Sequence, residues 1–130
     1  IARQTVVLDD PDDWRRPGDA FIRFGRHFEN LFKNIGEVRD GFPEAVPYGD
    51  VANRDEYDPE TIRRNQMIGT PDEIIRRIQR YADWGVDQYC FHIDGGMSHA
   101  EKKRSLELFI DQVMPAFADA RPAAAGQQWG

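Results

Sequence analysis

The stretch at residues 67–93 constrains the fold most strongly, because it has the pattern of a strand, a helix and a second strand. Thr70 and Glu73 have the spacing of a capping box, and Pro71 suits the first helical position, where no backbone N–H donor is needed. Gly85 supplies a helix stop, and the β-branched and aromatic residues after it favour a strand. Strands joined through a helix pair in parallel, so the sequence predicts an α/β fold.

Further helices are predicted from caps and from apolar residues at helical spacing. Asp58 with Pro59 begins a short helix, and Ser98 with Glu101 forms a second capping box. Pro115 is expected to kink or weaken the last turn of the helix that follows Ser98. The apolar stripe of that last helix consists of Leu106, Phe109, Val113, Met114 and Phe117.

The first half of the chain allows more than one interpretation. Residues 4–8 are β-prone and form either a strand or a strap. The helix that follows carries a dense aromatic stripe, which suggests burial against a large partner surface. This stripe consists of Ala20, Phe21, Phe24, Phe28, Leu31, Phe32 and Ile35. Residues 41–50 contain too many glycines and prolines for regular structure, and they form either part of a lid over a substrate or a connection on an outer rim.

Composition argues against several classes of function. The 130-residue chain has a formal net charge of −6, which gives no support to nucleic acid or an anionic membrane as a partner. No apolar run approaches the length of a membrane span, and no signal peptide is visible. Cys90 is the single cysteine, so we expect no internal disulfide and a reducing, cytoplasmic location. We also expect Cys90 to be buried and no metal to be bound.

The predicted strands are too few to form a stable sheet alone. Two parallel strands leave both outer edges unpaired, and purely parallel sheets are normally covered on both faces within a larger sheet or barrel. The remaining strands are expected to come from a missing N-terminal portion, a partner chain or a symmetry mate. Because Ile1 begins the chain inside a β-prone pattern, we interpret the chain as a piece of a longer protein that forms a homo- or hetero-oligomer.

Four motifs follow one another in a fixed order in the second half of the chain. They are GTPDEII at residues 69–75, YADWGVD at residues 81–87, RSLELF at residues 104–109 and VMPAF at residues 113–117. Together they resemble the C-terminal end of the bacterial luciferase-like monooxygenase family. Members of that family are flavin- or deazaflavin-dependent enzymes on a (β/α)8 TIM barrel.

The resemblance implies that this chain is the C-terminal piece of such a barrel. Residues 1–64 are then a helical and loop excursion ahead of the seventh barrel strand. Residues 65–120 supply the last two βα units, and residues 121–130 form a mobile tail. The first six strands, which in relatives supply most contacts to flavin and substrate, are absent. The isolated chain is therefore expected to be inactive.

In a TIM barrel the active site forms at the carboxyl ends of the strands. The resemblance therefore makes Gly69, Thr70, Asp94, Gly95 and Gly96 the candidate cofactor-binding residues, for FMN or the deazaflavin F420. Glycines allow close backbone approach, and helix N-termini attract anions such as phosphate. The alternative interpretation is that these are ordinary turn and capping residues.

His92 is a weak candidate for a catalytic residue. It lies near the end of the predicted second strand and shares a face with Cys90 and Asp94. If that face points into the barrel, His92 approaches the flavin or the substrate. If the face points outward, His92 packs against a helix.

Two functions are open at this point. The first is a part of a flavin-dependent oxidoreductase that passes two electrons from reduced flavin to oxygen and then oxidises a small-molecule carbon substrate. Its partner would be the missing N-terminal barrel portion or another chain. The second is a non-catalytic interaction module that uses the aromatic helix and the open strand edges for assembly.

Overall fold

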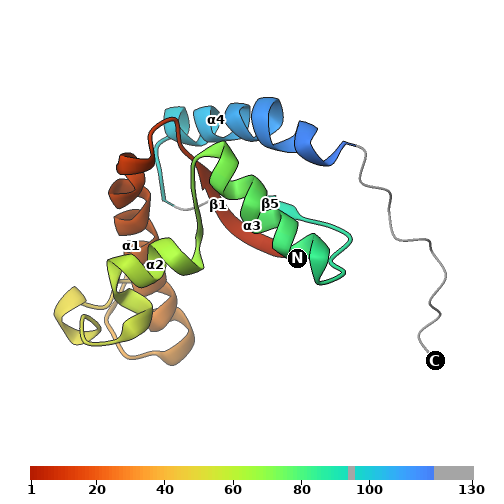
Figure 1. Cartoon of the computed structure of the whole chain (residues 1–130). Coiled ribbons are helices and arrows are strands. Elements are labelled where there is room, and N and C mark those ends of the chain that lie inside the picture. Colours follow the sequence, from red (N-terminus) through yellow and green to blue (C-terminus); the bar gives the residue numbers. More distant parts are fainter. Residues whose placement is uncertain (94–95, 119–130) are drawn as a thin grey trace.

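The computed structural model describes residues 1–93 and 96–118, in which a parallel sheet lies between two layers of helices. Strand β1 (Ala2–Val7) is in the middle of this sheet, with β4 (Met67–Gly69) on one side and β5 (Cys90–His92) on the other (Figure 1). Both outer strands run parallel to β1. The predicted α/β class is therefore confirmed.

The position of β1 corrects the expected strand order. The sequence implied that the strands at residues 67–68 and 86–93 pair with each other, whereas β1 separates them. Thr5, Val6 and Val7 are all buried, so this half of β1 is covered on both faces, as is typical of a central parallel strand. Of the two interpretations of residues 4–8, the strand is confirmed.

β5 is shorter than the strand predicted at residues 86–93. The register pairs Cys90 with Ala2, and before this pair the ladder extends only to Ile1 among the described residues: Cys90 N–H donates to Ile1 O at 2.8 Å, and the Ile1 amino group donates to Gln88 O at 2.7 Å. The prediction that Cys90 is buried is wrong, because its side chain is exposed. Its neighbour Phe91 packs against the helical layer, and Cys90 therefore points to the opposite, uncovered face of this edge strand.

Helices cover the two faces of the sheet over separate hydrophobic cores. They are α1 (Arg15–Lys33), α2 (Pro59–Asn65), α3 (Pro71–Asp83) and α4 (His99–Leu108). Val6 belongs to the core shared with α1 and α2, whereas Val7 belongs to the core shared with α3 and α4. Figure 1 shows α1 and α2 side by side at the left, and α4 above α3. Two adjacent valines of one strand thus pack against two different helical layers.

Two local signals set the ends of α2 and α3 as predicted. The Thr61 backbone N–H donates to Asp58 Oδ2 at 2.8 Å, which caps α2. Gly85 follows α3 with φ of 84°, a left-handed conformation that glycine adopts without steric cost.

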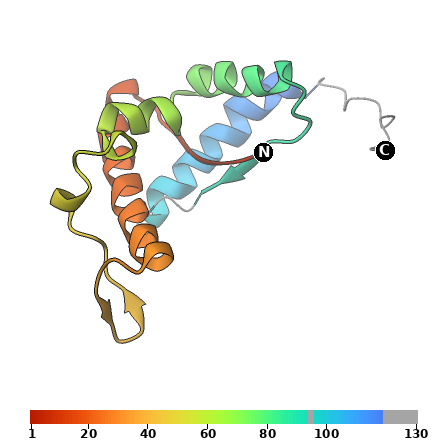
Figure 2. The same ribbon diagram turned by 90° about the horizontal axis from the view of Figure 1, so that it is seen from below.

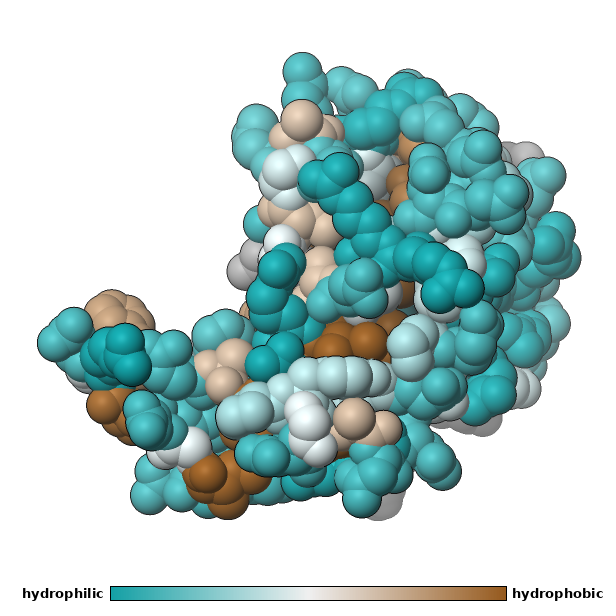
Figure 3. All heavy atoms as spheres, turned by 90° about the vertical axis from the view of Figure 1, so that its left-hand side faces the viewer, coloured by the Kyte–Doolittle hydropathy of each residue, from teal (hydrophilic) through white to brown (hydrophobic). Residues whose placement is uncertain are grey.

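α1 begins at Arg15, earlier than expected, and exposes the last part of its aromatic stripe. Phe24, Phe28 and Phe32 form a row with ring centroids 4.6 and 5.4 Å apart. Phe28 is 37% exposed and Phe32 is 75% exposed. Figure 3 shows the side of the molecule that is at the left in Figure 1, with apolar surface at its lower edge and on a projecting part of the chain. The described residues bury Ala20 and Phe21 of this stripe but do not cover Phe28 and Phe32.

The loop predicted at residues 41–50 is partly regular. β2 (Val38–Arg39) and β3 (Phe42–Pro43) pair antiparallel and form an arm, which extends from the far end of α1 (Figure 2). Asp40 and Gly41 have φ of 51° and 83°, as a two-residue hairpin turn requires. No regular structure is predicted here from the sequence, although an Asp-Gly dipeptide is typical of such a turn. Short 3₁₀ helices lie at Pro11–Trp14, Tyr48–Asp50 and Asp55–Tyr57.

The end of the last helix is irregular, as Pro115 predicted. α4 continues into a π-helical turn at Phe109–Val113 and a 3₁₀ turn at Met114–Phe117. Proline lacks an N–H donor and crowds the preceding turn, which explains the widened turn before it. The predicted stripe needs two corrections, because Leu106 is 38% exposed and Met114 is 52% exposed, whereas Leu108, which the stripe left out, is buried.

The predicted mobile tail at residues 121–130 lies outside the described residues. Within residues 1–93 and 96–118, no helix combines the length and the hydropathy needed to cross a membrane.

Replacing Ile74 with alanine should destabilise the chain strongly. Ile74 is fully buried in the core beneath α3 and α4, and truncation of such a residue costs about 2–5 kcal/mol. Urea unfolding followed by circular dichroism measures this loss. Arg76→Ala, an exposed position on the same helix, is the control and should change the free energy of unfolding by less than about 0.5 kcal/mol. Equal effects of the two substitutions would contradict the described core.

Candidate functional site

The three parallel strands end on the same side of the sheet, which we call the carboxyl edge. In open α/β sheets ligands bind outside these ends. A pocket of about 400 Å³ lies there, between the end of β1 and the first turns of α1 and α4. Its lining includes Leu8, Asp9, Asp13, Arg16, Glu101 and Arg104.

Two ion pairs are formed by residues that line this pocket. Arg104 donates two hydrogen bonds to the Asp9 carboxylate, one of them from Nε to Oδ2 at 2.9 Å. Arg16 Nε lies 2.7 Å from Glu101 Oε1. With Asp13, three carboxylates line the pocket together with two guanidinium groups, so the lining has one excess negative charge. A free anion is therefore not favoured here.

These contacts keep the carboxyl groups ionised. The hydrogen bonds from Arg104 lower the pKa of Asp9. Hydrogen bonds from Ser98, and then the charge of Arg16, lower the pKa of Glu101. A general acid at neutral pH needs a raised carboxyl pKa, so neither group suits that role.

Gly69 and Thr70, two of the predicted cofactor-binding residues, lie at the carboxyl edge where β4 meets α3. Thr70 N–H donates to Glu73 Oε2 at 2.9 Å, so the capping-box carboxylate already occupies this helix N-terminus. A Cβ on Gly69 would lie 2.5 Å from the same oxygen. The glycine therefore makes room for Glu73, and an anion would compete with that carboxylate.

Gly96 lies in the turn before α4, and Asp94 and Gly95 lie outside the described residues. Gly96 has φ of 75°, which explains a glycine at this position. The N-terminus of α4 is filled like that of α3, because Ser98 N–H donates to Glu101 Oε2 at 2.9 Å. β1 lies between β4 and β5, and a Cβ on Gly96 would lie 3.7 Å from Ala20 O of α1.

His92 lies on a part of the sheet that we call the open face, formed by Ala2, Gln4, Cys90 and His92. Phe91 packs toward α3 and α4, so the adjacent His92 points the other way, and its side chain is exposed. His92 pairs in register with Gln4, whose Oε1 is buried without a hydrogen-bond partner among the described residues. His92 therefore does not pack against the α3 and α4 layer. It also does not line the carboxyl-edge pocket.

Sequence reasoning missed two features of this edge. Ser105 is 2% exposed, and its Oγ accepts a hydrogen bond from Val7 N–H at 2.8 Å, which fixes α4 to β1. A polar residue between the apolar positions of α4 was the available signal. The pair of Asp9 and Arg104 joins residues 95 positions apart, so no local pattern reveals it.

Comparison with known proteins connects this α/β chain to flavin-dependent monooxygenases. The chain is 36% identical over 121 residues, 93% of its length, to the oxygenase component of a flavin-dependent trigonelline monooxygenase from Acinetobacter baylyi. It spans 34% of the length of that relative. No protein-family model and no solved structure matches the chain. The similarity to a flavin-dependent monooxygenase, predicted from the motifs, is confirmed.

The ion pair of Asp9 and Arg104 predicts a measurable change in titration. In Arg104→Leu the pKa of Asp9 should rise toward its ordinary value, because the bound guanidinium group is lost. Carboxyl ¹³C chemical shifts against pH measure this. A lowered folded-state pKa stabilises the fold above the unfolded-state pKa, and this contribution is lost as the pH falls through the folded-state value. In the control Lys103→Leu, whose lysine lies 3.8 Å from Glu107, the Asp9 pKa should not change.

Gly69→Ala should remove the α3 cap at a cost of about 0.5–2 kcal/mol in the free energy of unfolding. The added methyl group displaces the Glu73 carboxylate from Thr70 N–H. Gly49→Ala is the matched control, because a Cβ there would meet nothing within 4 Å. Urea unfolding compares the two variants. If Gly69→Ala changes the free energy of unfolding as little as Gly49→Ala does, the α3 cap does not require a glycine at position 69.

Proposed function

We propose that this chain is part of the oxygenase component of a flavin-dependent monooxygenase, as the C-terminal piece of a longer polypeptide. The similarity over 93% of the chain to the oxygenase component from Acinetobacter baylyi carries this proposal. The chain matches only 34% of that relative, so the rest of such a protein would supply other parts of the site. The proposed reaction uses reduced flavin and oxygen to oxidise a small organic substrate.

The open face supports this interpretation. Cys90 and His92 are exposed on a parallel sheet whose opposite face is covered by helices, and such sheets are normally covered on both faces. The exposed Phe28 and Phe32 on α1 likewise need a covering surface. We propose that the remainder of the longer protein covers both the open face and the exposed rings of α1. His92 would then be enclosed near the active site.

A (β/α)8 barrel with residues 65–120 as its last two βα units is the proposed architecture. The parallel sheet and the helix between β4 and β5 support it. The central position of β1 departs from the sequential strand order of a barrel. Residues 1–64 therefore supply a strand in addition to the proposed excursion.

The described residues do not form a complete flavin site. The N-termini of α3 and α4 are filled by Glu73 and Glu101, and the pocket at the carboxyl edge has excess negative charge. Phosphate contacts for FMN or F420 would therefore come from the rest of the longer protein. Within residues 1–93 and 96–118, no three His, Cys, Asp or Glu side chains are grouped to hold a metal ion.

The proposed partner is a reductase that supplies reduced flavin, because the relative is described as one component of its enzyme. We further propose a cytoplasmic location, since an exposed free cysteine such as Cys90 suits a reducing compartment.

The test uses a polypeptide of the relative's length that contains these residues, supplied with a flavin reductase, nicotinamide cofactor and ¹⁸O₂. Trigonelline is the first substrate to try, and reconstitution with FMN or F420 identifies the cofactor. Incorporation of one ¹⁸O atom into the product supports the proposal. The isolated 130-residue chain should show no turnover, because most of the site is elsewhere. Failure of the longer protein to bind reduced flavin or to transfer oxygen would overturn the proposal.

A further inference from the structure

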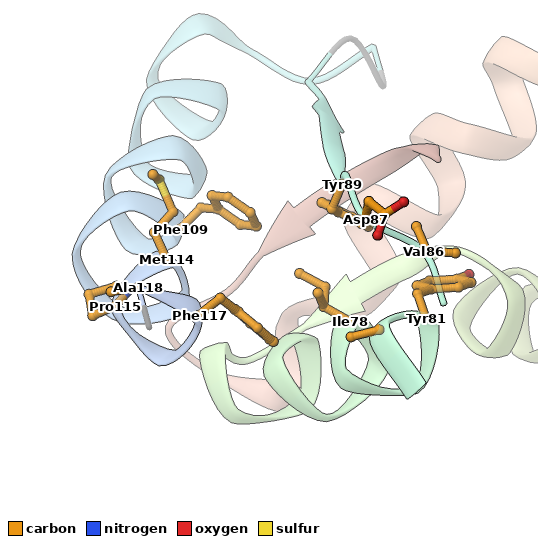
Figure 4. Close-up of a pocket in the computed structure, with 11 residues that line it drawn as sticks. Ile78, Tyr81, Val86, Asp87, Tyr89, Phe109, Met114, Pro115, Phe117 and Ala118 are labelled. Atoms are coloured by element: carbon orange, nitrogen blue, oxygen red, sulfur yellow. The ribbon is translucent and has the colours of Figure 1, made fainter. Parts of the chain in front are cut away.

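Helix α3 has apolar residues on one face and arginines on another. Figure 4 shows Ile78 of this helix beside an apolar pocket of about 640 Å³. On the outer face Arg80 follows Arg76 by four positions and Arg77 by three, so it lies next to both on the helix surface. Three positively charged side chains are therefore neighbours there.

A hollow of about 390 Å³ lies among these side chains. Its lining consists of Glu73, Arg76, Arg77 and Arg80. Oε2 of Glu73 accepts a hydrogen bond from Thr70 N–H at 2.9 Å, so this oxygen is already used by the α3 cap. Three guanidinium groups against one carboxylate give the hollow an excess of positive charge.

A smaller hollow of about 110 Å³ adjoins the first, because Arg77 and Arg80 line both. Arg64 of α2 and Trp84 also line it, and Trp84 is 74% exposed. Met67 lies here too and is the first residue of β4, so this place is at the opposite end of the sheet from the carboxyl edge. The proposed flavin chemistry does not use it.

Arg77 is held in position without a ligand. Its Nη1 donates to the backbone oxygens of Arg63 and Gln66, at 3.2 and 2.6 Å. These bonds satisfy carbonyl groups at the end of α2, which explains an arginine at position 77. Its Nε and Nη2 have no hydrogen-bond partner among the described residues and are free to bind an anion.

The other two arginines of α3 have no partner that explains them. The side chains of Arg76 and Arg80 are exposed and form no ion pair or hydrogen bond within residues 1–93 and 96–118. Burial lowers the pKa of Arg77, Glu73 opposes this effect, and the positive charges of Arg80 and Arg63 lower the pKa further. These guanidinium groups therefore repel one another, and an anion bound among them would remove that repulsion.

We propose that the two hollows together bind a diphosphate group, as free pyrophosphate or as part of a nucleoside diphosphate. Four arginines and one glutamate line them, which leaves three excess positive charges. A phosphate group carries about 1.5–2 negative charges at pH 7, so two such groups match this excess. The planar guanidinium group forms paired hydrogen bonds with phosphate oxygens. The exposed ring of Trp84 offers a surface on which the base of a nucleotide can stack.

Isothermal titration calorimetry of the 130-residue chain with inorganic pyrophosphate tests the proposal. One pyrophosphate should bind per chain, and Arg80→Gln should weaken binding at least about fivefold, because Arg80 lines both hollows. Arg23→Gln is the matched control, since Arg23 is an exposed arginine of α1 that lines neither hollow. The control should change the affinity by less than about twofold, because it alters only the net charge. Far-ultraviolet circular dichroism checks that both variants keep their fold.

Comparison with ADP distinguishes the two sources of the diphosphate group. If the ligand is a nucleotide, ADP should bind more tightly than pyrophosphate, and Trp84→Leu should remove this advantage. If the ligand is free pyrophosphate, it should bind at least as tightly as ADP. Absence of pyrophosphate binding, or equal weakening by Arg80→Gln and Arg23→Gln, would overturn the proposal. None of these results depends on flavin binding or oxygen transfer, so this test and that of the proposed function can fail separately.

Discussion

The structure depends on the burial of one short parallel strand, β1, on both of its faces. Val6 and Val7 point in opposite directions, and each enters the hydrophobic core of a different helical layer. β4 and β5 bond to β1 on either side, and Ser105 of α4 bonds to its last N–H group. Every helical layer and both other parallel strands are therefore positioned by six residues, Ala2–Val7.

Charge at the carboxyl edge is largely satisfied within the chain. Glu73 and Glu101 occupy the N-termini of α3 and α4, while Arg104 and Arg16 bind carboxylates from neighbouring segments. These contacts join neighbouring elements, and they leave neither of these two helix N-termini free to bind a phosphate. On the open face Cys90 and His92 are exposed, although a parallel sheet is normally covered on both faces.

Local chemistry made much of the fold predictable. The capping box at Thr70, the cap at Asp58 and the stop at Gly85 each act within a few residues, so the sequence alone reveals them. The order of the strands was not predictable, because β1 pairs with residues more than sixty positions away. For the same reason the Asp9 and Arg104 pair could not be foreseen. Exposure of Cys90 follows from its edge position, which also depends on that order.

Amide hydrogen exchange of the 130-residue chain tests the central role of β1 most directly. If β1 organises the fold, the slowest-exchanging amides should include those of Val6 and Val7, with protection close to the global free energy of unfolding. Amides of the arm at β2 and β3 should exchange much faster, because that hairpin is exposed. Exchange of the β1 amides as fast as those of the arm would contradict the account.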